Sequence, residues 1–315
     1  MEKANLLEFE VFCKVLEERL RGVLGSEADV EYTKITKNNG VVYNAILVRR
    51  HGENVSPTIY LEQFYKTYQN GAGFDKVVDE FVEIYRESLH NTDFDVSFFM
   101  DFSRVSEHLS FRVVNYKKNK SRLDNVPIRR CEDLAFVPLC VIDDIKDQTG
   151  TIVINNQHLD LWEVSEEELW ENVYENAEKN APLVVKGIEE FVSLRTGIRI
   201  DEMIPNIYVV SNKSLCYGAA TVFFPGVLKQ LSEKLRGDVL IIPSSVHETI
   251  ILGSSGCLEM DSHLIDIVKE VNETTLSSEE ILSDNVYYYS AKEDKVESIK
   301  TMLERSNAYS LEYDQ

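Results

Sequence analysis

The segment 243–248, Pro-Ser-Ser-Val-His-Glu, contains the three side-chain types that hydrolytic enzymes combine. A serine hydroxyl becomes a nucleophile when a histidine accepts its proton and a carboxylate orients that histidine. Ser244 or Ser245 with His247 and an acidic partner would supply these groups. The spacing argues against a triad, because adjacent strand residues such as His247 and Glu248 point to opposite faces of a sheet. A turn capped by its own side chains explains the same residues without catalysis.

Two other loops carry polar groups suited to binding. One follows a predicted strand at 155–158, and the other ends a second strand at 212–213. Binding groups collect in loops at strand ends, so the three loops would share one ligand if their strands ended at the same sheet edge. The alternative is that each side chain caps its own loop. The candidate site residues are Asn155, His158, Asn212, Lys213, Ser244, Ser245, His247 and Glu248. None is assigned a catalytic role.

The sequence contains no recognisable metal or cofactor motif. His247-Glu248 does not begin a zinc-protease motif, because Ile251 stands where the second histidine is required. The glycines of 253–256 lack the lysine that follows in a phosphate-binding loop. The cysteines are scattered and form no Cys-x-x-Cys pair: Cys13, Cys131, Cys140, Cys216 and Cys257. We therefore expect neither a bound metal nor a cofactor.

The composition is strongly acidic. Among 315 residues, 33 are Lys or Arg and 54 are Asp or Glu, which gives a formal net charge of −21. Such a charge disfavours direct contact with nucleic-acid phosphates or anionic lipids. No apolar run approaches the ~20 residues of a membrane span, and no basic, then apolar leader opens the chain. We expect a cytoplasmic protein with reduced thiols, whose partner is another protein and neither nucleic acid nor membrane.

Hydrophobic periodicity predicts a first α+β module over residues 1–95. A helix over 5–24 is followed by strands at 30–36 and 41–48, joined by Asn39-Gly40, a pair typical of tight hairpins. A third strand lies within 55–60, and helices follow at 61–69 and 74–89.

A larger module is predicted over residues 96–315. It has a strand at 109–113, a hairpin of 134–142 with 151–154, and a helix after Ser165, whose hydroxyl and Glu168 suit a capping box. Further helices are expected at 184–194 and 264–271. Strands are expected at 206–212, 238–242, 246–252 and 285–289, followed by a polar, partly helical tail. Adjacent antiparallel pairing is expected for 239–242 and 246–252. The fold class is α+β, with mixed or antiparallel sheets and helices packed on one face.

The basic residues Lys117, Lys118, Lys120 and Arg122 form one cluster. We interpret this cluster as a solvated helix or loop, because a lone basic patch in so acidic a chain is weak evidence for phosphate binding.

Many segments resemble an uncharacterised bacterial family of unknown function, numbered 5688. The resemblance spans most of residues 30–290 and includes Asn38–Val41, Ser56–Glu62, Asn115–Lys120, Ser211–Lys213, Pro243–Glu248 and Leu282–Asn285. A fainter similarity, in Trp162–Asn180 and at 242–244, is to a second uncharacterised family of Gram-positive bacteria. The resemblance implies a single architecture and no known reaction, cofactor or partner.

Three functional hypotheses follow. The favoured one is a non-catalytic cytosolic protein that binds or regulates another protein, because no nucleophile, metal or nucleotide motif is convincing. The second is a hydrolase that uses Ser244 or Ser245 with His247. The third is an acidic mimic of nucleic acid that binds a basic protein through the glutamate-rich helix 166–178.

Overall fold

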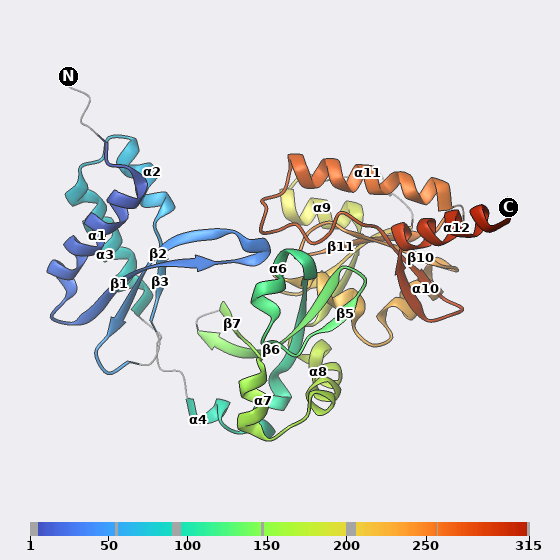
Figure 1. Ribbon diagram of the computed structural model, residues 1–315, viewed down its shortest axis with the longest axis horizontal. Helices are drawn as coiled ribbons and strands as arrows, with labels where there is room; N and C mark the ends of the chain where they lie inside the picture. The colour runs from blue at the N-terminus through green and yellow to red at the C-terminus, as the bar shows by residue number, and fades with distance from the viewer. Residues whose placement is uncertain are drawn as a thin grey trace. The chain divides into compact units, whose positions relative to one another are not determined.

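The computed structural model describes residues 6–53, 56–89, 96–145, 148–199, 206–256 and 258–313. The chain divides into two compact units, residues 1–97 and 98–315, each with its own hydrophobic core (Figure 1). The class is α+β, and the paired strands of the described residues are antiparallel, as predicted. The predicted module boundary lies beside residues 90–95, which are outside the described part, so it stays a prediction.

Unit 1 is a three-stranded sheet with helices on one face. Its elements are α1 (Phe9–Leu24), β1 (Ala28–Thr36), η1 (Asn38–Gly40), β2 (Val42–Arg50), β3 (Thr58–Tyr60), α2 (Glu62–Gln69) and α3 (Phe74–Ser88). The order is β1-β2-β3. Asn39 and Gly40 take φ values of 57° and 76° at the hairpin turn, where a small polar residue and a glycine are least strained. The predicted Asn-Gly hairpin is therefore confirmed.

Unit 2 contains two sheets. The four-stranded sheet consists of β4 (Leu109–Asn115), β5 (Arg129–Cys131), β6 (Leu134–Ile145) and β7 (Gln148–Val153). The six-stranded sheet has the order β13-β12-β10-β11-β9-β8. Its strands are β8 (Leu183–Gly187), β9 (Ile207–Asn212), β10 (Val239–Pro243), β11 (Thr249–Gly253), β12 (Tyr287–Ser290) and β13 (Lys295–Ser298).

The helices of this part of the chain connect and cover the two sheets (Figure 1). They are α4 (Val96–Phe99), α5 (Phe102–Val105), η3 (Ser106–His108), α6 (Tyr116–Leu123), α7 (Asn156–Trp162), α8 (Glu166–Asn180), α9 (Ile188–Thr196), η4 (Gly218–Phe223), α10 (Val227–Leu235), α11 (Leu258–Thr274) and α12 (Ile299–Tyr313). The Ser165 hydroxyl accepts the Glu168 N–H at 3.1 Å and so caps α8. The serine half of the predicted capping box is confirmed, but in the described residues no bond returns from the Glu168 side chain to the Ser165 N–H.

One core joins both sheets of unit 2. Phe111 of β4 contacts the rings of Trp170 on α8 and Phe224 after η4, at centroid distances of 5.9 and 5.2 Å. The same core includes Ile241 of β10 and Ile251 of β11. Burial of aromatic side chains contributes most of the stabilisation in such a core. This continuous core holds the loops at the ends of β4, β9 and β10 in fixed positions.

The carboxylate of Asp133 links the two sheets through four hydrogen bonds. Oδ1 accepts from the Asn285 amide at 2.9 Å and the Tyr287 hydroxyl at 2.7 Å. Oδ2 accepts from the Ser283 hydroxyl at 2.8 Å and the Asn115 amide at 3.2 Å. Four donors to one carboxylate fix the position of both of its oxygens. The segment 283–287 is therefore fixed against the end of β4.

Two predicted elements differ from the structure. Residues 184–187, expected to open a helix, lie in strand β8, because Val184 and Val185 pair with Ser211 and Val210 of β9. The helix α9 begins only at Ile188. The tail after 291 contains strand β13, whose Glu297 pairs with Tyr288. In both places strand pairing overrides local propensity: β8 pairs with the distant β9, and β13 pairs with the preceding β12.

Candidate functional site

The predicted pairing of β10 with β11 is confirmed, with Ile242 opposite Ile250. The second strand begins at Thr249, however, and not at Val246. Residues 244–248 form a loop, so the expectation that His247 lies on a strand is wrong. The physical reason is that this loop makes its own hydrogen bonds: the Ser245 N–H donates to the Glu248 carbonyl at 3.2 Å.

The Ser245 hydroxyl closes this turn. It donates to Glu248 Oε1 at 3.0 Å and accepts the N–H of His247 at 2.9 Å. Ser245 is only 3% exposed. Glu248 Oε2 also accepts from Arg195 Nη2 at 3.1 Å. The hydroxyl proton therefore points to a carboxylate and not to the imidazole, and Glu248 does not orient His247.

His247 connects the loop to the segment that follows β9. Its carbonyl oxygen accepts the Ser211 hydroxyl at 2.8 Å, and its Nδ1 accepts the Tyr217 N–H at 3.1 Å. An imidazole that accepts at Nδ1 carries its proton on Nε2 when neutral. Nε2 lies 3.9 Å from Glu280 Oε1. The imidazole thus has its ring orientation fixed by a backbone donor.

The segment 212–218 is held by equally local bonds. Asn212 Oδ1 accepts from the Cys216 N–H at 3.1 Å and from the Ser214 hydroxyl at 3.0 Å, and its amide donates to the Cys216 carbonyl at 2.8 Å. A methyl group at Gly218 would lie 2.3 Å from Ser211 Oγ and 2.7 Å from the His247 carbonyl oxygen. Only glycine permits this close approach of the two loops.

Lys213 and Ser244 take little part in these contacts. Lys213 is exposed, and its backbone N–H donates to the Pro182 carbonyl at 2.9 Å. Ser244 is half-buried, and no hydrogen bond joins its hydroxyl to another residue in the described ranges. Neither side chain has a partner that would activate it.

Asn155 and His158 form a separate group. They make a reciprocal cap of α7: Asn155 Oδ1 accepts the His158 N–H at 3.1 Å, and His158 Nδ1 accepts the Asn155 N–H at 3.2 Å. The His158 ring meets the edge of Phe99 at 4.9 Å, and burial lowers its pKa. No contact between described residues joins this group to His247, and α7 lies apart from β11 in Figure 1. The structure thus brings together Asn212, Ser245, His247 and Glu248, without Asn155 and His158.

An arginine that the sequence analysis did not single out lies beside this group. Arg112 projects from β4, and its guanidinium lies over the Tyr217 ring, 5.3 Å from the centroid. Its Nε atom is buried and has no hydrogen-bond partner. Within the described parts of the chain, no carboxylate forms an ion pair with this guanidinium. Arg112, Tyr217 and His247 therefore form a connected polar set, which we call the Arg112 site.

The electrostatics of the Arg112 site are unusual for so acidic a chain. Burial lowers the pKa of Arg112, Tyr217 raises it, and the positive charge of Arg122 lowers it. A buried charge is costly unless it is paired and hydrogen-bonded. The sequence signal for this feature is the one charged residue of β4, which lies opposite Val137.

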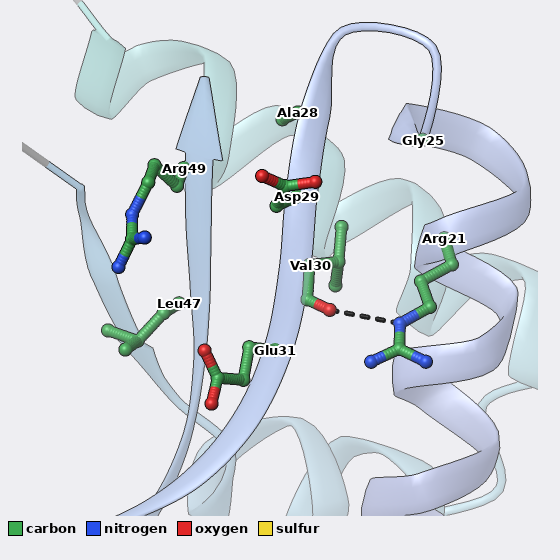
Figure 2. A pocket seen from close by; sticks show the side chains of 8 residues that line it. All are labelled: Arg21, Gly25, Ala28, Asp29, Val30, Glu31, Leu47 and Arg49. Carbon is green, nitrogen blue, oxygen red and sulfur yellow. Dashed lines mark hydrogen bonds between the residues drawn. The ribbon is translucent and has the colours of Figure 1, made fainter. Parts of the chain in front are cut away.

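Unit 1 contains an open pocket with a volume of about 600 Å³ (Figure 2). It lies along β1 and β2, where Asp29 is opposite Arg49. Arg21 donates to the Val30 carbonyl at 3.0 Å and to Glu17 at 2.7 Å. The lining contains two arginines and two acidic residues, so its charges balance, and Arg21 is already hydrogen-bonded.

Comparison with known proteins places the chain in a family. The model of a Family of unknown function (DUF5688) matches residues 9–291. The chain belongs to DUF5688. The DUF5688 match includes the whole Arg112 site and ends before β13 and α12. No curated protein and no solved structure matches the chain.

Metal-ligand clusters, membrane-spanning helices and thiols are the other features that bear on the chemistry of this DUF5688 member. In the described residues, no group of three or more His, Cys, Asp or Glu side chains is placed to hold a metal ion, and no helix is long and apolar enough to cross a membrane. Burial raises the pKa of the Cys13 and Cys140 thiols to about 12. Cys257, one of the scattered cysteines, lies outside the described residues.

Proposed function

We propose that this protein is a non-catalytic cytoplasmic binding protein, and that its Arg112 site receives an anionic group carried by a protein partner. The observation that supports this function is the half-buried side chain of Arg112, whose Nε atom is buried without a partner and which has no anion among the described residues. An incoming carboxylate or phosphate would pair with it through two parallel hydrogen bonds.

The surroundings of Arg112 support binding. Tyr217 and His247 are held by hydrogen bonds within and between their two loops, so the site is rigid before a ligand arrives. Rigid sites lose less entropy on binding. Tyr217 is 39% exposed, which leaves its ring accessible to a partner at the rim of the site. Aromatic and arginine side chains together are typical of binding hot spots.

The hydrolase hypothesis receives less support. A triad requires the serine hydroxyl to donate to the imidazole, but Ser245 donates to Glu248. The His247 Nδ1 atom accepts a backbone N–H. The mimicry hypothesis lacks a comparable observation, because Arg129 lies 3.9 Å from Glu166 and 4.0 Å from Glu167, at the start of the acidic helix.

The proposal is tested by calorimetric titration of the full chain with three anions of one shape class: phenylacetate, phenyl sulfate and phenyl phosphate. At constant ionic strength, which keeps screening equal, at least one should bind the wild type and fail to bind Arg112→Met. Arg104→Met is the matched control, because Arg104 also lies over a ring, that of Phe98 at 5.2 Å, but is exposed. Equal binding by wild type and Arg112→Met would contradict the proposal, as would no binding at all.

A further inference from the structure

We propose that the outer edge of strand β8 is a surface through which two copies of this chain associate, by pairing β8 with β8 of the second copy. This inference concerns the six-stranded sheet and goes beyond the function proposed for the Arg112 site. Among the described residues, β8 is the last strand of that sheet and is hydrogen-bonded only to β9. All five of its residues, Leu183–Gly187, are half-buried. One long side of β8 is therefore open to a further strand.

The backbone groups at this edge follow from the pairing with β9. The Lys213 N–H donates to the Pro182 carbonyl at 2.9 Å, in the same register that pairs β8 with β9. Along an antiparallel strand, residues that bond to one neighbour alternate with residues whose N–H and C=O face the other way. Pro182 and Val184 thus face β9. Leu183 and Val185 direct their N–H and C=O groups outward, and no hydrogen bond between described residues satisfies these groups.

The edge strand of unit 1 is protected in a way that β8 is not. The outward Val30 carbonyl of β1 accepts from Arg21 at 3.0 Å (Figure 2). The outward Tyr32 N–H donates to Glu17 at 3.0 Å. Side chains of helix α1 therefore take the place of a neighbouring strand. Proteins protect edges in such ways because a free edge pairs with other chains, so the unprotected edge of β8 indicates a surface that pairs.

The sequence of β8 is compatible with its own copy. An antiparallel two-fold pairing about Val184 places Leu183 opposite the second copy's Val185. Both of these side chains already pack against the main core of unit 2, so the pairing extends that core from one copy to the other. In the same register, Lys186 lies opposite the second copy's Pro182. No like charges therefore oppose each other across the two strands.

The charge of the chain favours the same edge. Two copies that each carry a formal net charge of −21 repel one another over most of their surface. Residues 181–187 include no acidic residue, and their one cation, Lys186, is paired with Glu190 of α9. Like-charged copies approach at least cost through such a neutral edge. Salt should thus strengthen the association, whereas it would weaken a contact between opposite charges.

The deciding experiment is disulfide trapping on the two-fold axis. Val184 would face its own copy in a non-hydrogen-bonded pair, where Cα atoms lie about 4.5 Å apart. A disulfide requires about 4.4–6.8 Å, so mild oxidation of full-length Val184→Cys should give a covalent dimer on a non-reducing gel. Lys186→Cys, on the same face of β8 but off the axis, is the matched control and should stay monomeric. Both variants also carry Cys216→Ser, which removes the exposed native thiol.

Analytical ultracentrifugation of the full chain, from about 1 μM to 1 mM, measures the association without a cross-link. The wild type should shift from monomer to dimer as its concentration rises, and more strongly at high salt. Val185→Pro should lose the dimer, because proline removes an outward N–H and leaves the bonds to β9 intact. Val184→Lys should also lose it, because like charges would meet on the axis. Melting followed by tryptophan fluorescence confirms that unit 2 of each variant is folded.

Each outcome decides the inference. Trapping of Val184→Cys together with loss of the dimer in Val185→Pro and Val184→Lys would establish it. A wild type that sediments as a monomer over the whole range would overturn it, and β8 would then be free for an extended segment of a different protein. A disulfide that forms as readily from Lys186→Cys, or a dimer that persists in both β8 variants, would show that the copies meet elsewhere, and the inference would again be wrong.

Discussion

Replacement of Arg112 by methionine should stabilise unit 2 in the absence of ligand. Methionine keeps most of the length of the side chain and its apolar stem, and it removes a buried cationic donor that has no partner. An unsatisfied buried donor costs about 1–3 kcal/mol, and more when it is charged. The lost contact with the Tyr217 ring is worth about 0.5–1 kcal/mol. The expected net gain in the free energy of unfolding is about 1–2 kcal/mol.

The chain offers a selective probe for this measurement. Its two tryptophans, Trp162 and Trp170, both lie in unit 2, so tryptophan fluorescence during thermal or urea unfolding reports that unit alone. For a unit of this size, 1 kcal/mol corresponds to about 2–4 °C in Tm. Arg112→Met should therefore melt about 2–8 °C above the wild type. The control Arg104→Met should show no gain, because that side chain is exposed.

A loss of stability in Arg112→Met would refute the reasoning. It would mean that the guanidinium is already compensated and that its charge contributes to folding. A saturating anion that binds the wild type provides an internal check, because a ligand at ~100 times its Kd stabilises the native state by about 2.7 kcal/mol. This shift should appear in the wild type and disappear in the variant.

Three further predictions concern other parts of unit 2 and the core of unit 1. In a urea titration, Gly218→Ala should destabilise unit 2 by about 1–3 kcal/mol, because the new methyl group overlaps backbone atoms. The control Gly237→Ala should be neutral or stabilising, because nothing lies within 4 Å of the new methyl group there. Burial lowers the pKa of His158. The contribution of its neutral imidazole to the free energy of unfolding is therefore fully present above the unfolded pKa of about 6.5, and it is lost as pH falls through the lower pKa of the folded state. His158→Gln, which keeps the cap, should flatten the fall in urea midpoint below about pH 6.5, and an unchanged slope would contradict this. Iodoacetamide should modify the exposed Cys216 before Cys13, whose thiol has a pKa raised to about 12; mass spectrometry showing early modification of Cys13 would contradict the assignment.

Local signals in the sequence were sufficient for several elements. The Asn39-Gly40 turn and the Ser165 cap depend on neighbouring residues only, so residue type predicts them directly. β8 was missed because its strand character depends on pairing with β9, which begins 24 residues after Leu183, at Ile207. Short strands of this kind have no local signature that separates them from a helix start.

The candidate site was predicted only as a set of loops. The segment 243–248 was noticed because its residue types are chemically suggestive, but the inference about its side chains assumed a strand. Arg112 could not be chosen, because nothing near it in the sequence shows that Tyr217, 105 positions later, covers it. Burial and the absence of a partner are properties of the tertiary fold.

The four bonds to Asp133 have a consequence for the order in which the chain folds. Three of the donors, on Ser283, Asn285 and Tyr287, follow it by 150, 152 and 154 residues. A ribosome that adds about 5–20 residues per second delivers them roughly 8–30 s after the carboxylate has been synthesised. During that interval Asp133 lacks these three donors, and the segment 283–287 cannot yet dock against the end of β4. The link that Asp133 makes between the two sheets is thus expected to form only after β12 has been synthesised, and nascent chains arrested before Ser283 should be digested by protease more readily than the complete unit 2.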